Sequence, residues 1–147
     1  MTQIEYAKKG ETTSQMEFVA KREHRDVEFI RQRVANGSVV IPANVNHINL
    51  EPCGIGRELL TKINANIGNS SMASCPSEEA AKLEAAVKYG ADTVMDLSTG
   101  GNIHQIRTRL IANSTIPVGT VPIYEMVARE GAAKISRQLV LQVIKEQ

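Results

Sequence analysis

Two asparagines separated by a single residue are the feature of this sequence best suited to binding chemistry. Asn64 and Asn66 belong to the run 62–70, Lys-Ile-Asn-Ala-Asn-Ile-Gly-Asn-Ser, which alternates polar and apolar residues as a β-strand does. Side chains alternate between the two faces of a strand, so both asparagines should lie on one face. Each carboxamide offers donors and an acceptor, and burying such a pair is costly unless it finds partners. The run therefore predicts a polar ligand pocket built onto a core strand.

The pattern recurs at a regular distance along the chain. Two further β-prone runs, 93–97 and 117–121, also end in polar or glycine-containing segments. Asn66, Met95 and Tyr124 lie at or just past the C-terminal ends of the three predicted strands, with 29 residues in each step (95 − 66 and 124 − 95). One strand–helix unit takes roughly 30 residues. The spacing therefore predicts three successive units that carry these side chains at equivalent positions.

The segments between the predicted strands favour helices. Ser77 can cap a helix that opens at Pro76, and Gly90 supplies its C-terminal stop. Asn102 can cap a second helix, and a third is predicted within 136–147. Strands that alternate with helices in this way form a parallel sheet with right-handed crossovers.

The residues before the first of these strands predict a smaller, separate layer. The Ser14 to Glu17 spacing is that of a capping box at the start of a short helix. A second helix is expected from Asp26 to Gly37, followed by an extended segment at 38–44 and a turn-rich connection. This opening should pack against the sheet or against a second subunit.

The choice of α/β architecture depends on the loop after the first predicted strand. That loop, 67–71, is not the G-x-G-x-x-G turn of a dinucleotide-binding fold. A barrel with ligand residues at the C-terminal strand ends fits better, although a complete one takes about 250 residues. We therefore expect an N-terminal accessory region at 1–60 and, at 61–147, the first three units of an incomplete (β/α)₈ barrel.

Composition narrows the class of protein. With 147 residues, 42% hydrophobic, 22% charged and a formal net charge of +1, the chain is an ordinary globular segment, and nothing in it is basic enough to indicate nucleic-acid binding. No run approaches the roughly 20 apolar residues of a membrane span, and the start lacks the apolar core of a signal peptide, which predicts a cytoplasmic protein. The two cysteines and three histidines show no metal-ligand spacing.

Polar residues beside the three candidates are further possible functional groups. Asp96 follows Met95 and should face the other way, which suits a hydrogen bond to a loop backbone or a neighbouring helix. The run 98–102 precedes a predicted helix and has N–H groups that can bind phosphate. Its two glycines are needed in any case for the turn from strand to helix, so a structural role is favoured over phosphate binding.

Five ordered runs carry a strong resemblance to a known family. They are Met1-Thr-Gln-Ile-Glu-Tyr-Ala7, Val40-Ile-Pro-Ala-Asn44, Lys62-Ile-Asn-Ala-Asn-Ile-Gly-Asn-Ser70, Gly90-Ala-Asp-Thr-Val-Met-Asp-Leu-Ser-Thr-Gly100 and Gly119-Thr-Val-Pro-Ile-Tyr124. In this order they resemble the N-terminal part of the phosphomethylpyrimidine synthase family, the thiamine pyrimidine enzymes of the radical S-adenosylmethionine class. The resemblance spans essentially the whole chain.

The resemblance implies a lyase of thiamine biosynthesis with a (β/α)₈ barrel. Such an enzyme rearranges 5-aminoimidazole ribotide by 5′-deoxyadenosyl radical chemistry into a phosphorylated hydroxymethylpyrimidine, and releases formate and carbon monoxide. In that family the positions that match Asn66, Met95 and Tyr124 contact the ribotide. The spacing argument selects the same three residues. The family resemblance also suggests a homodimer.

The cofactors of the family are a [4Fe-4S] cluster, S-adenosylmethionine and zinc. The resemblance places the metal-binding histidines and the three-cysteine cluster motif downstream of Gln147, so their ligands are not expected in this chain. No catalytic residue and no metal ligand is assigned here, and the isolated 147 residues are expected to be inactive.

Two alternatives stay open at this stage. The first is the paralogue 5-hydroxybenzimidazole synthase, which acts on the same ribotide; the run 49–56 keeps it open, and so does Glu125, where pyrimidine synthases often have glutamine. The second is a short, non-catalytic binding or dimerisation module. Three strand–helix units leave an open hydrophobic edge, so that module would have to oligomerise.

Overall fold

The computed structural model describes residues 1–70 and 76–147 of the chain. These residues divide into two compact units. The N-terminal unit comprises Met1–Lys62 and Thr115–Pro117, and the sheet unit comprises Ile63–Ser114 and Val118–Gln147.

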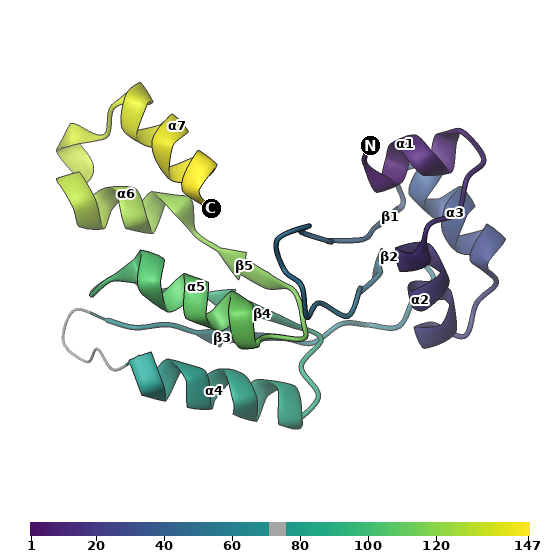
Figure 1. Cartoon of the computed structure of the whole chain (residues 1–147), viewed down its shortest axis with the longest axis horizontal. Coiled ribbons are helices and arrows are strands. Elements are labelled where there is room, and N and C mark those ends of the chain that lie inside the picture. Colours follow the sequence, from purple (N-terminus) through teal and green to yellow (C-terminus); the bar gives the residue numbers. More distant parts are fainter. Residues whose placement is uncertain (71–75) are drawn as a thin grey trace. The chain divides into compact units, whose positions relative to one another are not determined.

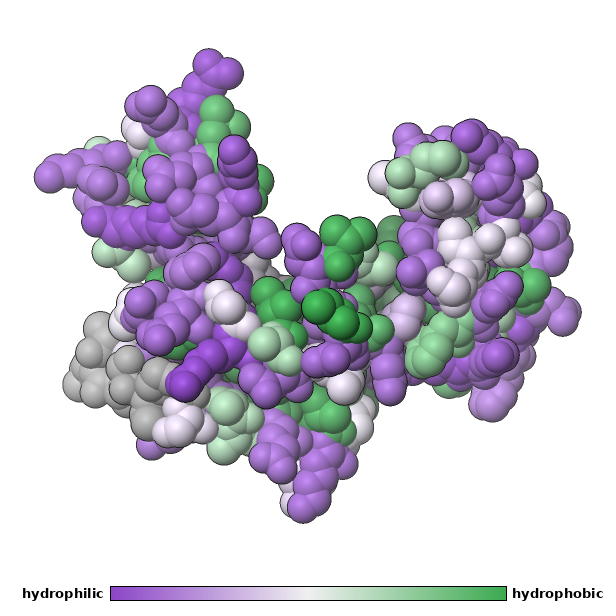
Figure 2. Space-filling view, in the orientation of Figure 1, coloured by the Kyte–Doolittle hydropathy of each residue, from purple (hydrophilic) through white to green (hydrophobic). Residues whose placement is uncertain are grey.

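The N-terminal unit consists of short helices and a small antiparallel strand pair (Figure 1). Its elements are α1 (Gln3–Lys8), α2 (Ser14–Arg22), α3 (Val27–Ala35), β1 (Val39–Val40) and β2 (Ile55–Gly56). Strand β1 pairs with β2 in antiparallel register. Hydrophilic and neutral residues cover most of this unit's surface in the view of Figure 2.

Local capping sets the helix starts in this unit. The N-cap of helix α2 lies one residue earlier than the sequence predicts. Thr13 is extended, and its Oγ1 accepts a hydrogen bond from the Met16 N–H at 3.2 Å. Ser14 is therefore the first helical residue and not the cap. Helix α1, which was not predicted, has a capping box between Thr2 and Glu5. Helix α3 follows Asp26 as expected.

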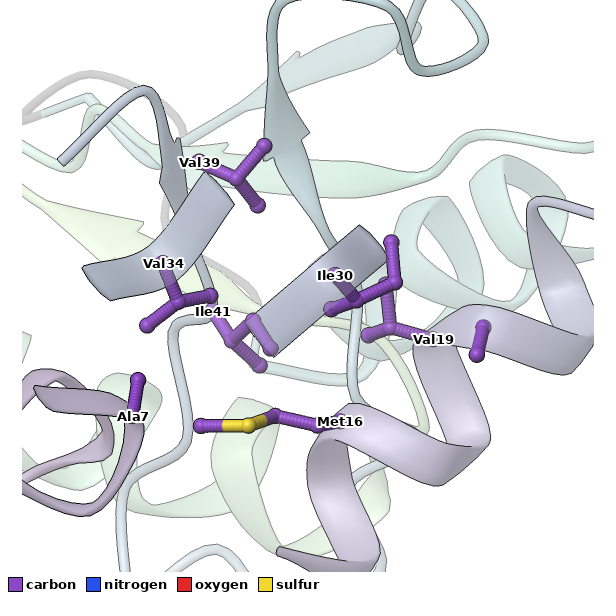
Figure 3. Close-up of a cluster of buried hydrophobic side chains, with 8 residues drawn as sticks. Ala7, Met16, Val19, Ile30, Val34, Val39 and Ile41 are labelled. Carbon is purple, nitrogen blue, oxygen red and sulfur yellow. The ribbon is translucent and has the colours of Figure 1, made fainter. Parts of the chain in front are cut away.

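An apolar core holds the helices of the N-terminal unit together. Met16 extends from α2 toward Ala7 of α1, and Ile30 of α3 lies beside Val19 (Figure 3). The buried members of this cluster are Ala7, Met16, Val19, Ala20, Ile30, Val34, Val39 and Ile41. Burial of their apolar surface stabilises the packing of these helices.

The sheet unit has a mixed α/β fold, as the sequence predicts. Its described residues form a parallel three-stranded sheet in the order β3-β4-β5. The strands are β3 (Asn64–Ile67), β4 (Thr93–Asp96) and β5 (Val118–Thr120), and the helices are α4 (Pro76–Lys88), α5 (Ile103–Asn113), α6 (Pro122–Glu130), η1 (Ala132–Lys134) and α7 (Arg137–Glu146). Helix α4 contacts both β3 and α5 (Figure 1).

The predicted helices α4, α5 and α7 are confirmed, while α6 is an addition. The Asn102 side chain caps α5 by accepting a hydrogen bond from the Gln105 N–H at 3.0 Å. Helix α6 begins with Pro122, whose fixed φ and missing N–H suit the first helical position. Tyr124 therefore lies in the first turn of a helix. No helix in the described part of the chain is long and apolar enough to cross a membrane.

Candidate functional site

Strand register places one row of residues across the sheet. Asn66 on β3 pairs with Met95 on β4, and Met95 pairs with Gly119 on β5. On the opposite face of β3 and β4, Ile67, Val94 and Asp96 are buried and Ala65 is half-buried. Asn66 is exposed and Met95 is half-buried, so the face that carries this row is open in the described structure. The register thus brings together two of the three residues selected from the sequence.

The asparagines of β3 form a hydrogen-bonded chain along this open face. The Thr93 hydroxyl donates to Asn64 Oδ1 at 2.9 Å, and Asn64 Nδ2 donates to Asn66 Oδ1 at 2.8 Å. Both asparagines are exposed, which corrects the expectation of a buried pair: their amides satisfy each other at the surface. One lone pair of the Asn66 oxygen accepts this bond, and the Asn66 Nδ2 adds two N–H donors to the exposed row.

Met95 forms an apolar surface beside these amides. A Cβ atom on Gly119 would lie only 2.9 Å from the Met95 Cε and 3.0 Å from its Sδ. The Met95 side chain therefore reaches from β4 across β5 and fills the space that a side chain at position 119 would occupy. A thioether is apolar, flexible and polarizable, and can pack against a sugar or a heterocycle.

Tyr124 is held by helix α6. Its backbone N–H donates to the Val121 carbonyl at 3.0 Å, and the side chain is 40% exposed. The ring can contact a planar ligand while the hydroxyl bonds a polar group. Asn66 and Met95 share a row of the sheet, whereas the position of Tyr124 depends on what fixes α6.

A buried carboxylate next to Tyr124 fixes that helix. Arg107 Nη1 of α5 donates to Glu125 Oε2 at 2.5 Å, and the two side chains are 3% and 4% exposed. Arg129 donates to Glu125 Oε1, and Gln147 Nε2 donates to Glu125 Oε2 at 2.9 Å. Gln147 also accepts from the Thr120 hydroxyl at the end of β5. The network joins β5, α5, α6 and the end of α7.

These donors outweigh the cost of burying the charge. Burial raises the pKa of Glu125, but hydrogen bonds from Arg107, Gln147 and Arg129 lower it, and the resulting pKa lies below the ordinary value of 4.5. Glu125 is therefore ionised at neutral pH and acts as a fixed anion for two arginines. This network was not predicted. Its signal in the sequence is Arg107, which lies on the apolar face of α5 four residues after Ile103.

Asp96 is also a structural residue, as its place in the strand predicts. It is buried, and its Oδ1 accepts hydrogen bonds from the Ser98 N–H at 3.0 Å and the Ser98 hydroxyl at 2.5 Å. The N–H of Thr99 donates to the Asn69 carbonyl at 2.8 Å. Two N–H groups of the run 98–102 thus already have protein acceptors, which favours the structural interpretation of this loop.

The fold and the candidate site together indicate a class of protein. Parallel strands that alternate with helices, with polar side chains near the strand ends, are typical of α/β proteins that bind ligands at that edge of the sheet. Residues 2–147 match the model of the Radical SAM ThiC family, and the chain belongs to this family.

Named relatives agree with the family match. The chain is 57% identical to the phosphomethylpyrimidine synthase of Natronomonas pharaonis over 147 residues, which are 99% of this chain and 31% of that protein. It is 54% identical to the phosphomethylpyrimidine synthase of Haloarcula marismortui over 148 aligned positions, which are 100% of this chain and 31% of that protein. The chain thus spans about a third of the length of these relatives.

The residues present do not fit an iron–sulfur cluster. A cluster that leaves one iron open for S-adenosylmethionine needs three cysteine thiolates. The sequence contains two cysteines, and Cys53 is buried in the N-terminal unit. Within residues 1–70 and 76–147, no group of three or more His, Cys, Asp or Glu side chains is arranged to hold a metal ion.

Proposed function

We propose that the protein containing these residues converts 5-aminoimidazole ribotide into 4-amino-5-hydroxymethyl-2-methylpyrimidine phosphate. The reaction is a radical, S-adenosylmethionine-dependent step of thiamine biosynthesis, formally that of a carbon–carbon lyase. The observation that carries the proposal is the family match over residues 2–147. The names of two relatives at 57% and 54% identity support it.

The part assigned to this chain is one side of the ribotide site. Asn66 donates hydrogen bonds from its Nδ2 to an oxygen or ring nitrogen of the ribotide, while its Oδ1 accepts from Asn64. Met95 packs against the sugar or the heterocycle, and the Tyr124 hydroxyl bonds a polar group of the same ligand. The open face of the sheet supports this assignment, since it exposes Asn66 beside Met95.

The proposal extends to the rest of the fold and to the assembly. The parallel sheet forms the first strands of a (β/α)₈ barrel, in which the open face lines the interior. A [4Fe-4S] cluster and zinc would be held by ligands outside these 147 residues, with S-adenosylmethionine as the third cofactor. The working protein is a cytoplasmic homodimer.

The test is to identify the product of the full-length protein. The protein is reconstituted anaerobically and supplied with 5-aminoimidazole ribotide, S-adenosylmethionine and a reductant, and the product is identified by mass spectrometry. We expect the phosphorylated pyrimidine. A hydroxybenzimidazole product would overturn the proposal in favour of the paralogous reaction. If neither the ribotide nor S-adenosylmethionine is consumed, both reactions are rejected.

A pair of asparagine variants tests the binding role. Asn66→Ala should raise the KM for the ribotide about ten-fold or more, because two donors to the ligand are lost. Asn113→Ala is the matched control, since Asn113 is exposed on α5 and its Nδ2 donates to the Arg109 carbonyl at 2.8 Å. Equal KM values for the two variants would remove Asn66 from the site.

A further inference from the structure

A buried chain of hydrogen bonds joins the C-terminal ends of β3 and β4. Asp96 Oδ1 accepts from both the N–H and the hydroxyl of Ser98. The same Ser98 hydroxyl oxygen accepts from the Asn69 N–H at 3.1 Å, and Asn69 Nδ2 donates to the Gly100 carbonyl at 3.1 Å. Asp96, Ser98 and Asn69 are all buried. We call these three residues the β3–β4 clasp.

The backbones approach closely at the same place. A Cβ atom on Gly68 would lie 2.7 Å from the Leu97 carbonyl carbon and 2.9 Å from the Ser98 nitrogen. Only glycine allows the end of β3 to come this near to the end of β4. The Leu97 N–H donates to the Ile67 carbonyl at 2.8 Å, and the Thr99 N–H donates to the Asn69 carbonyl. The clasp therefore lies where the two loops that follow β3 and β4 pack closely together.

The two loops form one wall of a pocket that is also lined by Asn66. The pocket has a volume of about 400 Å³. Asn66 and Lys82 line it together with Gly68, Asn69 and Thr99. The Lys82 ammonium bonds Glu79 Oε1 at 2.6 Å, and half of its side chain is exposed. The shape of the pocket depends on how the two loops are held.

We propose that Asp96 is a positioning residue for ribotide binding. Its carboxylate orients the Ser98 hydroxyl, which holds the Asn69 backbone, and this fixes the pocket wall next to Asn66. Asp96 itself faces away from the open side of the sheet and does not touch the ligand. The inference rests on the proposed function, because it needs the ribotide to bind at Asn66.

The chain offers a matched control at the opposite end of the same strand pair. Asp92 Oδ2 accepts from the Ile63 N–H at 2.8 Å, and the Asp92 N–H donates to the Ile63 carbonyl at 2.8 Å. Asp92 thus links β3 to β4 at their N-terminal ends, as the clasp does at their C-terminal ends. Both aspartates support the strand pair, but only Asp96 acts at the pocket.

The experiment compares Asp96→Ala, Asp96→Asn and Asp92→Ala in the reconstituted full-length protein. Both alanine variants should lower Tm. Asp96→Ala should also raise the KM and the Kd for the ribotide about ten-fold with kcat changed less than about two-fold, whereas Asp92→Ala should leave both constants unchanged. Asp96→Asn keeps an oxygen that accepts from Ser98 and should restore the wild-type KM.

Three outcomes would overturn the inference. They are an unchanged KM in Asp96→Ala, an equal rise in Asp92→Ala, and a failure of Asp96→Asn to restore binding. If Asp96→Ala does not fold, Ser98→Ala removes the bridging hydroxyl alone and should give the same rise in KM. Wild-type protein that neither binds nor turns over the ribotide would reject the proposed function itself, a result separate from any difference between variants.

Discussion

The two units of the molecule differ in how many polar side chains they bury: among the described residues, the N-terminal unit buries Glu23 and His47, and the sheet unit buries seven. The cluster at the centre of the N-terminal unit is entirely apolar. The sheet unit buries apolar residues as well, but also an arginine, several carboxylates and a hydrogen-bonded serine and asparagine. These polar residues are Asn69, Glu79, Asp96, Ser98, Arg107, Ser114 and Glu125.

This difference separates packing from orientation. Apolar contacts are non-directional, so the apolar cluster of the N-terminal unit is stabilised by shape and volume. Buried hydrogen bonds and ion pairs are directional, and breaking one leaves a costly unpaired group. In the sheet unit they lie directly behind the candidate ligand residues: Glu125 follows Tyr124, and Asp96 follows Met95. The unit that carries the site is thus the one that buries more polar side chains.

The largest effect on stability should come from the apolar core. Met16→Ala removes a side chain that is 0% exposed, and should lower the free energy of unfolding by about 2–5 kcal/mol. Urea unfolding measures the total, and hydrogen exchange with mass spectrometry assigns it to peptides of α1, α2 and α3. A loss of under about 1 kcal/mol would contradict the account of this unit as stabilised by close packing.

A charge deletion in the sheet unit should cost somewhat less. Arg107→Ala leaves Glu125 buried with its bonds to Arg129 and Gln147, so we expect a loss of about 3 kcal/mol, the low end for a broken buried pair. Faster hydrogen exchange should be confined to α5, α6 and α7. Arg129→Ala is the control, and it should cost less because that side chain is 30% exposed. Equal effects would show that burial does not decide the value of these ion pairs.

Acid should weaken the sheet unit through the same carboxylate. The pKa of Glu125 is below its ordinary value in the folded protein, so its ionised form stabilises the fold above pH 4.5, the ordinary value. That stability is lost as the pH falls through the folded pKa. Urea unfolding at a series of pH values should show a smaller acid loss for Glu125→Gln than for wild type. Parallel curves for the two proteins would contradict the assignment.

The smallest effect on stability is expected on the open face of the sheet. Met95→Ala removes a half-buried side chain, so the free energy of unfolding should fall by less than about 1 kcal/mol. Under the proposed function, the KM for the ribotide should nevertheless rise. Met16→Ala provides the contrast, since the same substitution there costs stability without touching the sheet face. A large loss of stability in Met95→Ala would show that this face is part of a core.

Local patterns in the sequence were sufficient for much of the sheet unit. The alternation at Asn64 and Asn66, the Asn102 cap and the place of Asp96 all depend on neighbours within a few residues, and the structure confirms each of them. The predicted cap differs from the observed Thr13 cap by one position, because Thr13 and Ser14 are adjacent hydroxyl residues that can each cap a helix start. Helix α6 was missed because a short strand runs directly into Pro122.

Contacts between distant residues could not be predicted in the same way. Arg107 and Glu125 are 18 positions apart, and their pairing depends on the packing of α5 against α6. The asparagine pair was expected to be buried, since strand alternation gives the direction of a side chain but not what covers it. The ligand roles of Asn66, Met95 and Tyr124 stay predictions that rest on the resemblance and the proposed function.

The contact between Met95 and Gly119 has a consequence for how this sequence can change over time. The Met95 methyl group occupies the volume in which any side chain at position 119 would begin. A side chain gained at 119 therefore requires either that the flexible end of Met95 turn away or that a shorter residue stand at 95. Substitutions at these two positions are therefore coupled, although 24 positions separate them in the sequence (119 − 95).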